Sequence, residues 1–129
     1  MRYRVLTMKW ITRACVREHR DYIFLFGDNL VRRGLGGQAA AMRGEPNVVG
    51  MPTKKLPSNS ENAFFTDSEL VQNKAVIDQA FEHLTHISIA PEQIIVIPAD
   101  GLGTGRAQLE SRAPLTFAYL QKRLAELSL

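Results

Sequence analysis

The sequence contains almost no cysteine: Cys15 is the single thiol among 129 residues. A lone cysteine cannot form a disulfide within the chain, and the three histidines are not clustered at the spacing of metal ligands. We therefore expect no internal disulfide, no metal site and no cofactor. Cys15 itself is expected to be a small core residue rather than a nucleophile.

Long apolar runs are absent as well. The longest, such as residues 94–98, have the length of a strand, far short of the roughly 20 residues that cross a membrane. The start, Met1-Arg2-Tyr3-Arg4, is not followed by the apolar region and small-residue cleavage site of a secretory signal. These features predict a cytoplasmic protein without a membrane partner.

The charge balance is only weakly basic. Lysine and arginine number 16 against 13 acidic residues, which gives a formal net charge of +3. The basic residues are scattered in pairs such as Arg32-Arg33 and Lys122-Arg123, a pattern that favours a small anionic ligand or a solvated surface over nucleic acid. With 45% hydrophobic and 22% charged residues, the composition predicts one globular domain over residues 1–129 and leaves the oligomeric state open.

Strand and helix patterns alternate along the chain without repeats or linkers. Strands are predicted over residues 3–8, 22–26, 47–51 and 93–98, with Pro52 ending the third strand and Pro91 restarting the chain before the fourth. Helices are predicted over residues 12–19, 38–43, about 67–84 and about 109–127. The alternation predicts an α/β fold: a three-layer α/β/α sandwich around a mixed, largely parallel sheet.

Two of the predicted helices have apolar sides that could pack on the sheet. These sides consist of Leu70, Val71, Ala75, Ile77, Ala80, Phe81 and Leu84 in one helix, and of Leu115, Ala118, Tyr119, Leu124 and Leu127 in the last. Residues 54–66 are polar and rich in turn formers, which is typical of a surface loop. The Phe64-Phe65 pair in this loop either packs into the core or covers a ligand as a stacking lid.

Three segments that follow predicted strands carry a candidate site. In parallel sheets, ligands bind beyond the carboxyl ends of the strands, where loops and helix N-termini present backbone N–H groups. Glycines let the backbone approach a phosphate and form an anion-binding nest. The candidate residues are Gly27, Asp28, Asn29, Gly34, Gly36, Gly37 and Gln38, then Pro52, Thr53 and Lys54, and finally Asp100, Gly101, Leu102, Gly103, Thr104, Gly105 and Arg106. Two glycine loops that each precede a helix predict a diphosphate pocket.

Two familiar nucleotide motifs do not fit these loops. A P-loop requires two glycines separated by four residues, with Lys and then Ser or Thr after the second glycine, and the chain contains no such string. A Rossmann fingerprint would place a glycine where Arg106 stands and would belong to the first βαβ unit. The glycine loops are therefore expected to bind another kind of nucleotide, or to serve only as tight turns.

The order of the motifs resembles that of a divergent macrodomain, and of the compact macro-like proteins of bacteria and phages. The resemblance rests on Gly-Asp-Asn at residues 27–29, Gly-Leu-Gly-Gly-Gln-Ala-Ala-Ala at 34–41, Val-Val-Gly-Met-Pro-Thr-Lys-Lys at 48–55 and Ile-Pro-Ala-Asp-Gly-Leu-Gly-Thr-Gly at 97–105. It implies a fold that holds ADP-ribose, with residues 34–38 and 101–106 flanking the diphosphate and the distal ribose. Asn29 and Gln38 would contact that ribose.

The segment Pro52-Thr53-Lys54-Lys55 is similar to one in the macrodomain branch that hydrolyses glutamate-linked terminal ADP-ribose. In that branch, the lysine matching Lys54 attacks the opened distal ribose. The branch's catalytic acid falls on Gly105, so Asp100 or Asp28 would have to supply the carboxylate. The resemblance thus implies an ADP-ribosyl hydrolase, or an ADP-ribose-phosphate phosphatase, that acts on an ADP-ribosylated macromolecule.

Two other classes of function stay open at this point. A non-catalytic protein that senses or sequesters a nucleotide derived from NAD would need the glycine loops but no catalytic acid. A nucleic-acid or protein-interaction module would need a surface whose affinity falls steeply with salt.

Overall fold

The computed structural model describes residues 3–88 and 92–128, so the restart predicted at Pro91 lies outside the described residues. Within this part the α-helices and strands are β1 (Arg4–Met8), α1 (Arg13–Glu18), β2 (Tyr22–Asn29), α2 (Ala39–Met42), β3 (Val48–Lys54), α3 (Leu70–Ile87), β4 (Ile94–Pro98), α4 (Leu109–Arg112) and α5 (Pro114–Ala125). Two short 3-10 helices, Glu61–Ala63 and Asp67–Glu69, lie between β3 and α3.

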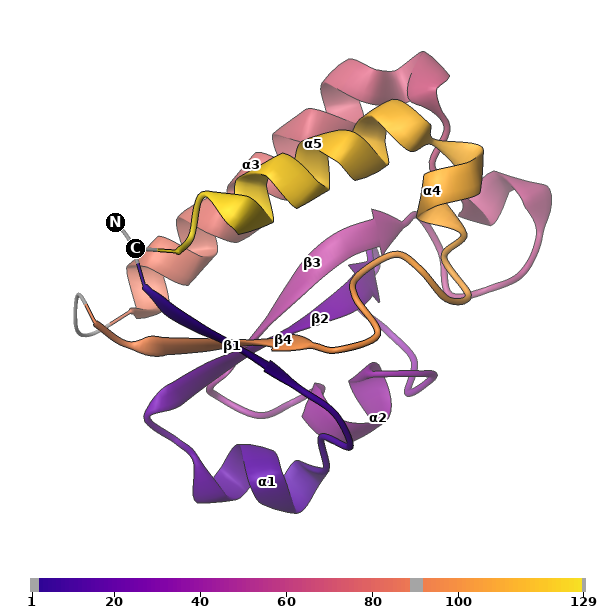
Figure 1. Cartoon of the computed structure of the whole chain (residues 1–129). Helices are drawn as coiled ribbons and strands as arrows, with labels where there is room; N and C mark the ends of the chain where they lie inside the picture. Colours follow the sequence, from indigo (N-terminus) through magenta and orange to yellow (C-terminus); the bar gives the residue numbers. More distant parts are fainter. Residues whose placement is uncertain (1–2, 89–91, 129) are drawn as a thin grey trace.

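The four strands form one sheet in the order β1-β4-β2-β3. Val96 of β4 pairs with Leu6 on one side and with Phe24 on the other, and β2 continues the sheet into β3. Helices α1 and α2 lie on one face of the sheet, and α3 and α5 lie on the other (Figure 1). The predicted α/β/α sandwich is confirmed, and every pairing between the described strands is parallel rather than mixed.

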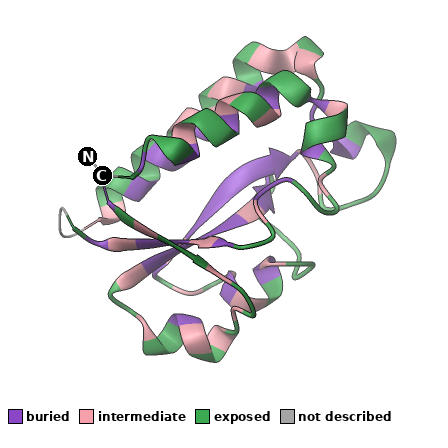
Figure 2. Cartoon of the chain, in the orientation of Figure 1, coloured by how far each residue is buried: buried purple, intermediate pink, exposed green. Residues whose placement is uncertain are grey.

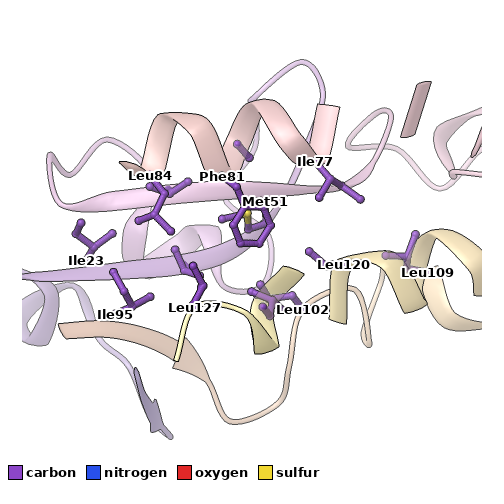
Figure 3. Close-up of a cluster of buried hydrophobic side chains, with 14 of the residues drawn as sticks. Ile23, Met51, Ile77, Phe81, Leu84, Ile95, Leu102, Leu109, Leu120 and Leu127 are labelled. Carbon is purple, nitrogen blue, oxygen red and sulfur yellow. The ribbon is translucent and has the colours of Figure 1, made fainter. Parts of the chain in front are cut away.

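Strand β2 is apolar at consecutive positions because both of its faces are covered. Ile23 and Leu25 belong to the core under α3 and α5, whereas Phe24 and Phe26 belong to the core under α1 and α2. Buried residues concentrate on the strands and on the helix sides that face them (Figure 2). Figure 3 shows the larger of the two cores.

Strands β2 and β3 extend further than predicted, and the extra residues belong to the candidate site. β2 continues to Asn29, and β3 continues through Pro52 to Lys54. The prediction that Pro52 ends the strand was wrong. β3 is the last strand in the order of the described sheet, and an edge strand tolerates a residue without an N–H group. Sheet pairing therefore places Asn29 opposite Lys54.

The predicted last helix is in fact two helices. α4 ends at Arg112 and α5 begins at Pro114, which has no N–H to continue the helical hydrogen bonds. The N–H groups of Leu115 and Thr116 in the first turn of α5 donate to the Asp67 carboxylate at 2.8 and 3.0 Å. Asp67 thereby stabilises the new helix start.

The apolar sides of α3 and α5 also differ from the prediction. Val71 is 79% exposed and Leu115 is 59% exposed. A buried polar pair lies between the two helices instead, because Asn73 Nδ2 donates to Thr116 Oγ1 at 3.0 Å. The buried positions of α3 and α5 are Asn73, Ile77, Ala80, Phe81, Leu84, Thr116, Leu120 and Leu124. No helix within the described ranges is both long and apolar enough to cross a membrane.

Candidate functional site

A pocket with a volume of about 320 Å³ opens at the carboxyl ends of β2, β3 and β4. This volume is within the range of small-molecule sites. Every predicted site residue lines the pocket except Pro52, which is buried in β3, and Leu102, which is buried in the core (Figure 3). The sequence did not identify five further lining residues: Arg33, Ala39, Arg43, Pro57 and Ala107.

Both glycine loops present backbone N–H groups to this pocket. Within the described part of the chain, the N–H groups of residues 36–38 and 103–107 donate no hydrogen bond. Gly37 and Gly103 have φ angles of +57° and +80°, in the left-handed region that glycine adopts without steric cost. Runs of N–H groups in such loops form concave sites for anions.

Several carbonyl groups near these N–H groups accept hydrogen bonds from donors of the chain itself. Arg43 Nε donates to the Gly34 carbonyl at 2.7 Å, and Arg43 Nη2 donates to the Arg33 carbonyl at 3.3 Å. In the late loop, Gln38 Nε2 donates to the Gly101 carbonyl at 2.9 Å, and Thr104 Oγ1 donates to the Asp100 carbonyl at 2.5 Å. The two loops therefore offer a ligand mainly hydrogen-bond donors.

Asp28 is buried and forms ion pairs with two arginines, closely with Arg43 and more distantly, at 3.7 Å, with Arg32. Its Oδ1 accepts from Arg43 Nη2 at 2.5 Å and from the Asn29 N–H at 2.8 Å, and its Oδ2 accepts from Arg43 Nη1 at 3.2 Å. Gly50 on β3 leaves room for this carboxylate, since a Cβ there would lie 2.6 Å from Asp28 Oδ2. Because both carboxylate oxygens are engaged, Asp28 positions Arg43 and is a poor candidate for moving protons.

The amide side chains of the site also make bonds within the chain. Asn29 Nδ2 donates to the Arg33 carbonyl at 2.8 Å, which ties the start of the first glycine loop to β2. Gln38 Oε1 accepts from the Gly27 N–H at 2.9 Å while its Nε2 reaches Gly101. Gln38 thus links the end of β2 to the late loop, and a ribose would compete with these bonds.

Lys54 is a buried lysine without a carboxylate partner in the described chain. Its Nζ donates to the Ser58 carbonyl at 2.6 Å and lies 4.9 Å from the centre of the Phe64 ring. Burial, and secondly the positive charge of Arg106, lower the pKa of Lys54 from its ordinary value of 10.5. Lys54 can therefore attract an anion as a cation, and it loses its proton more easily than a free lysine.

The pocket has an excess of positive charge. Arg33 and Arg106, like Lys54, form no ion pair with a carboxylate among residues 3–88 and 92–128. The Arg106 guanidinium lies over the first glycine loop, where a Cβ on Gly36 would be 2.8 Å from Nη1. Asp100 is exposed at the pocket wall, and its carboxylate is likewise unpaired in this part of the chain.

Phe64 and Phe65 are both buried, so the structure shows the core alternative rather than the lid. Phe65 belongs to the main core, and Phe64 lies against the Arg112 guanidinium, 3.8 Å from its ring centre. Neither residue lines the pocket. The Phe64 ring instead lies under the Lys54 amine and helps to position Lys54 at the edge of the pocket. Among the described residues there is no group of three or more His, Cys, Asp or Glu side chains that could hold a metal ion.

Comparison with protein families gives one finding. Residues 6–123 match the model of a family of unknown function, DUF7831, and the chain belongs to that family. Comparison with curated proteins and with solved structures gives no match.

Proposed function

We propose that this member of a family of unknown function binds an ADP-ribose-type nucleotide, with the diphosphate between the two glycine loops. The proposal rests on the lining of one pocket. The N–H groups of residues 36–38 and 103–107 donate no hydrogen bond in the described chain, and the lining cations Arg33, Lys54 and Arg106 form no ion pair with a described carboxylate. Backbone N–H groups can satisfy phosphate oxygens, and the cations balance their charge. A diphosphate has enough acceptors to use both loops at once.

The chemistry of the lining favours a nucleotide over a free phosphate. The pocket volume of about 320 Å³ exceeds what one phosphate needs, and the sugar hydroxyls of a nucleotide can donate to the exposed Asp100 carboxylate. The macrodomain resemblance of the motifs supports ADP-ribose as the particular nucleotide.

The burial of Lys54 and its lowered pKa support a second function, the cleavage of an ADP-ribosyl group from a carboxylate acceptor. In the proposed reaction, the neutral amine of Lys54 forms a C–N bond to the anomeric carbon of the distal ribose, and the bond from that carbon to the acceptor oxygen breaks. The acceptor leaves as a carboxylate, and water then cleaves the C–N bond. Asp100 is better suited than Asp28 to move the protons, because the Asp28 carboxylate is paired with Arg43.

The binding proposal is tested by calorimetric titration with ADP-ribose, AMP and inorganic phosphate. We expect ADP-ribose to bind most tightly, and Lys54→Met to weaken its binding by about ten- to hundredfold, the cost of one charged hydrogen bond. Lys55→Met is the matched control, because Lys55 pairs with Glu69 and does not line the pocket. Absence of ADP-ribose binding, or equal weakening by both substitutions, would contradict the proposal.

Hydrolysis is tested separately, with a protein that carries glutamate-linked ADP-ribose. We expect the wild-type chain to release free ADP-ribose over multiple turnovers, and Lys54→Met to abolish the release while Lys55→Met retains it. If ADP-ribose binds but is never released from the acceptor, the chain is a non-catalytic binder and the Lys54 reaction is refuted.

A further inference from the structure

A second hollow adjoins the candidate site. It has a volume of about 610 Å³ and lies between the segment that follows β1, helix α2 and the end of β4. Gly37, Gln38 and Asp100 line both hollows, so the two meet at these residues. In Figure 1 the segment between β1 and α1 passes beside α2. We call this second hollow the Trp10 groove.

The Trp10 groove differs chemically from the first pocket. Its lining includes the apolar residues Met8 at the end of β1, Ile11 after β1, Met42 of α2 and Pro98 of β4. Met8 and Ile11 are partly buried and pack in the same cluster as Met42. Among the described residues, the groove is lined by one cation, Lys9, and one carboxylate, Asp100, whereas four arginines and lysines line the first pocket. The groove therefore suits an uncharged, flat group rather than a phosphate.

Trp10 has two properties that packing of the protein core does not explain. Its side chain is 91% exposed, so it contributes almost nothing to the core. Its φ angle is +57°, in the left-handed region that is unusual for a bulky residue. Exposed large aromatic residues and strained backbone both occur preferentially where proteins bind ligands.

The sheet places Trp10 at the same edge as the late glycine loop. Met8 pairs with Pro98 across the parallel strands β1 and β4, and the Ala99 N–H donates to the Met8 carbonyl at 2.9 Å. Two residues further along, β1 leads to Trp10 and β4 leads to Asp100. A ligand that occupies the late loop therefore lies next to the Trp10 groove.

We propose that the Trp10 groove holds the planar base of the nucleotide, stacked on the Trp10 indole, while the phosphates occupy the glycine loops. This inference rests on the proposed nucleotide binding and assigns the part of the ligand that the first pocket does not hold. Every base has a π-face that stacks on an aromatic side chain, and removal of such a side chain weakens binding by about ten- to hundredfold.

The test uses the intrinsic fluorescence of the protein, because Trp10 is the only tryptophan in the chain. Wild-type protein is titrated with ADP-ribose and with inorganic pyrophosphate, which has the phosphates but no base. We expect ADP-ribose to quench and shift the Trp10 emission at saturation. Pyrophosphate binding, followed by calorimetry, is expected to leave the emission unchanged. An emission unchanged by bound ADP-ribose would overturn the inference.

Substitution at Trp10 separates a binding role from a structural one. Trp10→Gly is expected to weaken ADP-ribose binding about ten- to hundredfold and to leave pyrophosphate binding unchanged. It should not lower the melting temperature, because glycine relieves the left-handed backbone. Leu115→Ala, at an exposed apolar residue of α5, is the control that should change neither affinity.

The outcomes distinguish this inference from the proposed function. If wild-type protein binds ADP-ribose and Trp10→Gly binds it equally well, the Trp10 groove is not the base site while nucleotide binding stands. If wild-type protein binds neither ADP-ribose nor pyrophosphate, nucleotide binding fails and the base site fails with it.

Discussion

We predict that the ion pair between Asp28 and Arg43 stabilises the candidate site. Arg43 donates hydrogen bonds to both carboxylate oxygens of Asp28. It also donates to the backbone carbonyls of Arg33 and Gly34. The pair therefore connects strand β2 to the first glycine loop. Asp28→Asn and Arg43→Gln each remove one charge while keeping a side chain of similar size.

The size of the interaction follows from burial and geometry. The Asp28 side chain is 3% exposed and the Arg43 side chain 20% exposed, so solvent screens the pair only in part. A hydrogen bond to a charged group contributes about 1.5–3 kcal/mol, whereas loss of one partner from a fully buried pair costs about 3–5 kcal/mol. We expect each single substitution to lower the free energy of unfolding by roughly 2–3 kcal/mol.

The assay is a double-mutant cycle by urea denaturation. Because the two substitutions remove the same interaction, we expect the double variant to be about 2 kcal/mol more stable than the sum of the single effects predicts. A coupling free energy below about 0.5 kcal/mol would refute the argument that this pair orders the loop. Both single variants should also bind ADP-ribose more weakly, because Arg43→Gln removes the donor to the loop carbonyls and Asp28→Asn removes the carboxylate that positions that donor.

Three further predictions concern other parts of the structure. Hydrogen bonds from Arg13, and secondly from Arg20, lower the pKa of Glu45 from 4.5 to about 2. The ionised Glu45 carboxylate therefore stabilises the fold fully above pH 4.5, and this stabilisation is lost as the pH falls toward 2. In acid denaturation, Glu45→Gln should be less stable than wild type at pH 7, and the difference should vanish near pH 2. Gly103→Ala should cost about 3 kcal/mol of unfolding free energy, because its φ is +80° and the new Cβ would lie 2.9 Å from Leu109 Cβ; a loss below about 1 kcal/mol by chemical denaturation would contradict this. Since the pKa of Lys54 lies below 10.5, ADP-ribose affinity measured by calorimetry should fall with rising pH before a free lysine deprotonates, and Lys54→Met should remove that dependence.

Much of the fold could be predicted from local patterns. The uninterrupted apolar run of β2, the break signals around it and the alternation of strands with helices are properties of neighbouring residues, and they led to the correct α/β/α sandwich. The grouping of Gly27, Lys54 and Gly101 in one pocket could also be predicted, because parallel strands end at the same edge of a sheet.

The errors arose where a distant element changed the meaning of a local signal. Pro52 is a strand breaker by local rules, but the sheet order places it on an edge strand, where it is tolerated. Leu115 fits an apolar helix side, but Asn73 and Thr116 form a hydrogen-bonded pair between α3 and α5, and Leu115 remains exposed.

The sequence by itself determined the alternation of elements and the glycine loops, because backbone preferences and hydrophobic periodicity act between residues that are close along the chain. Only the tertiary structure decided which charges are paired. Arg43 neutralises Asp28 from 15 residues away, whereas Lys54 finds no carboxylate in the described chain and is left in the pocket. The distances between such side chains depend on how the helices pack on the sheet, and no local pattern encodes them.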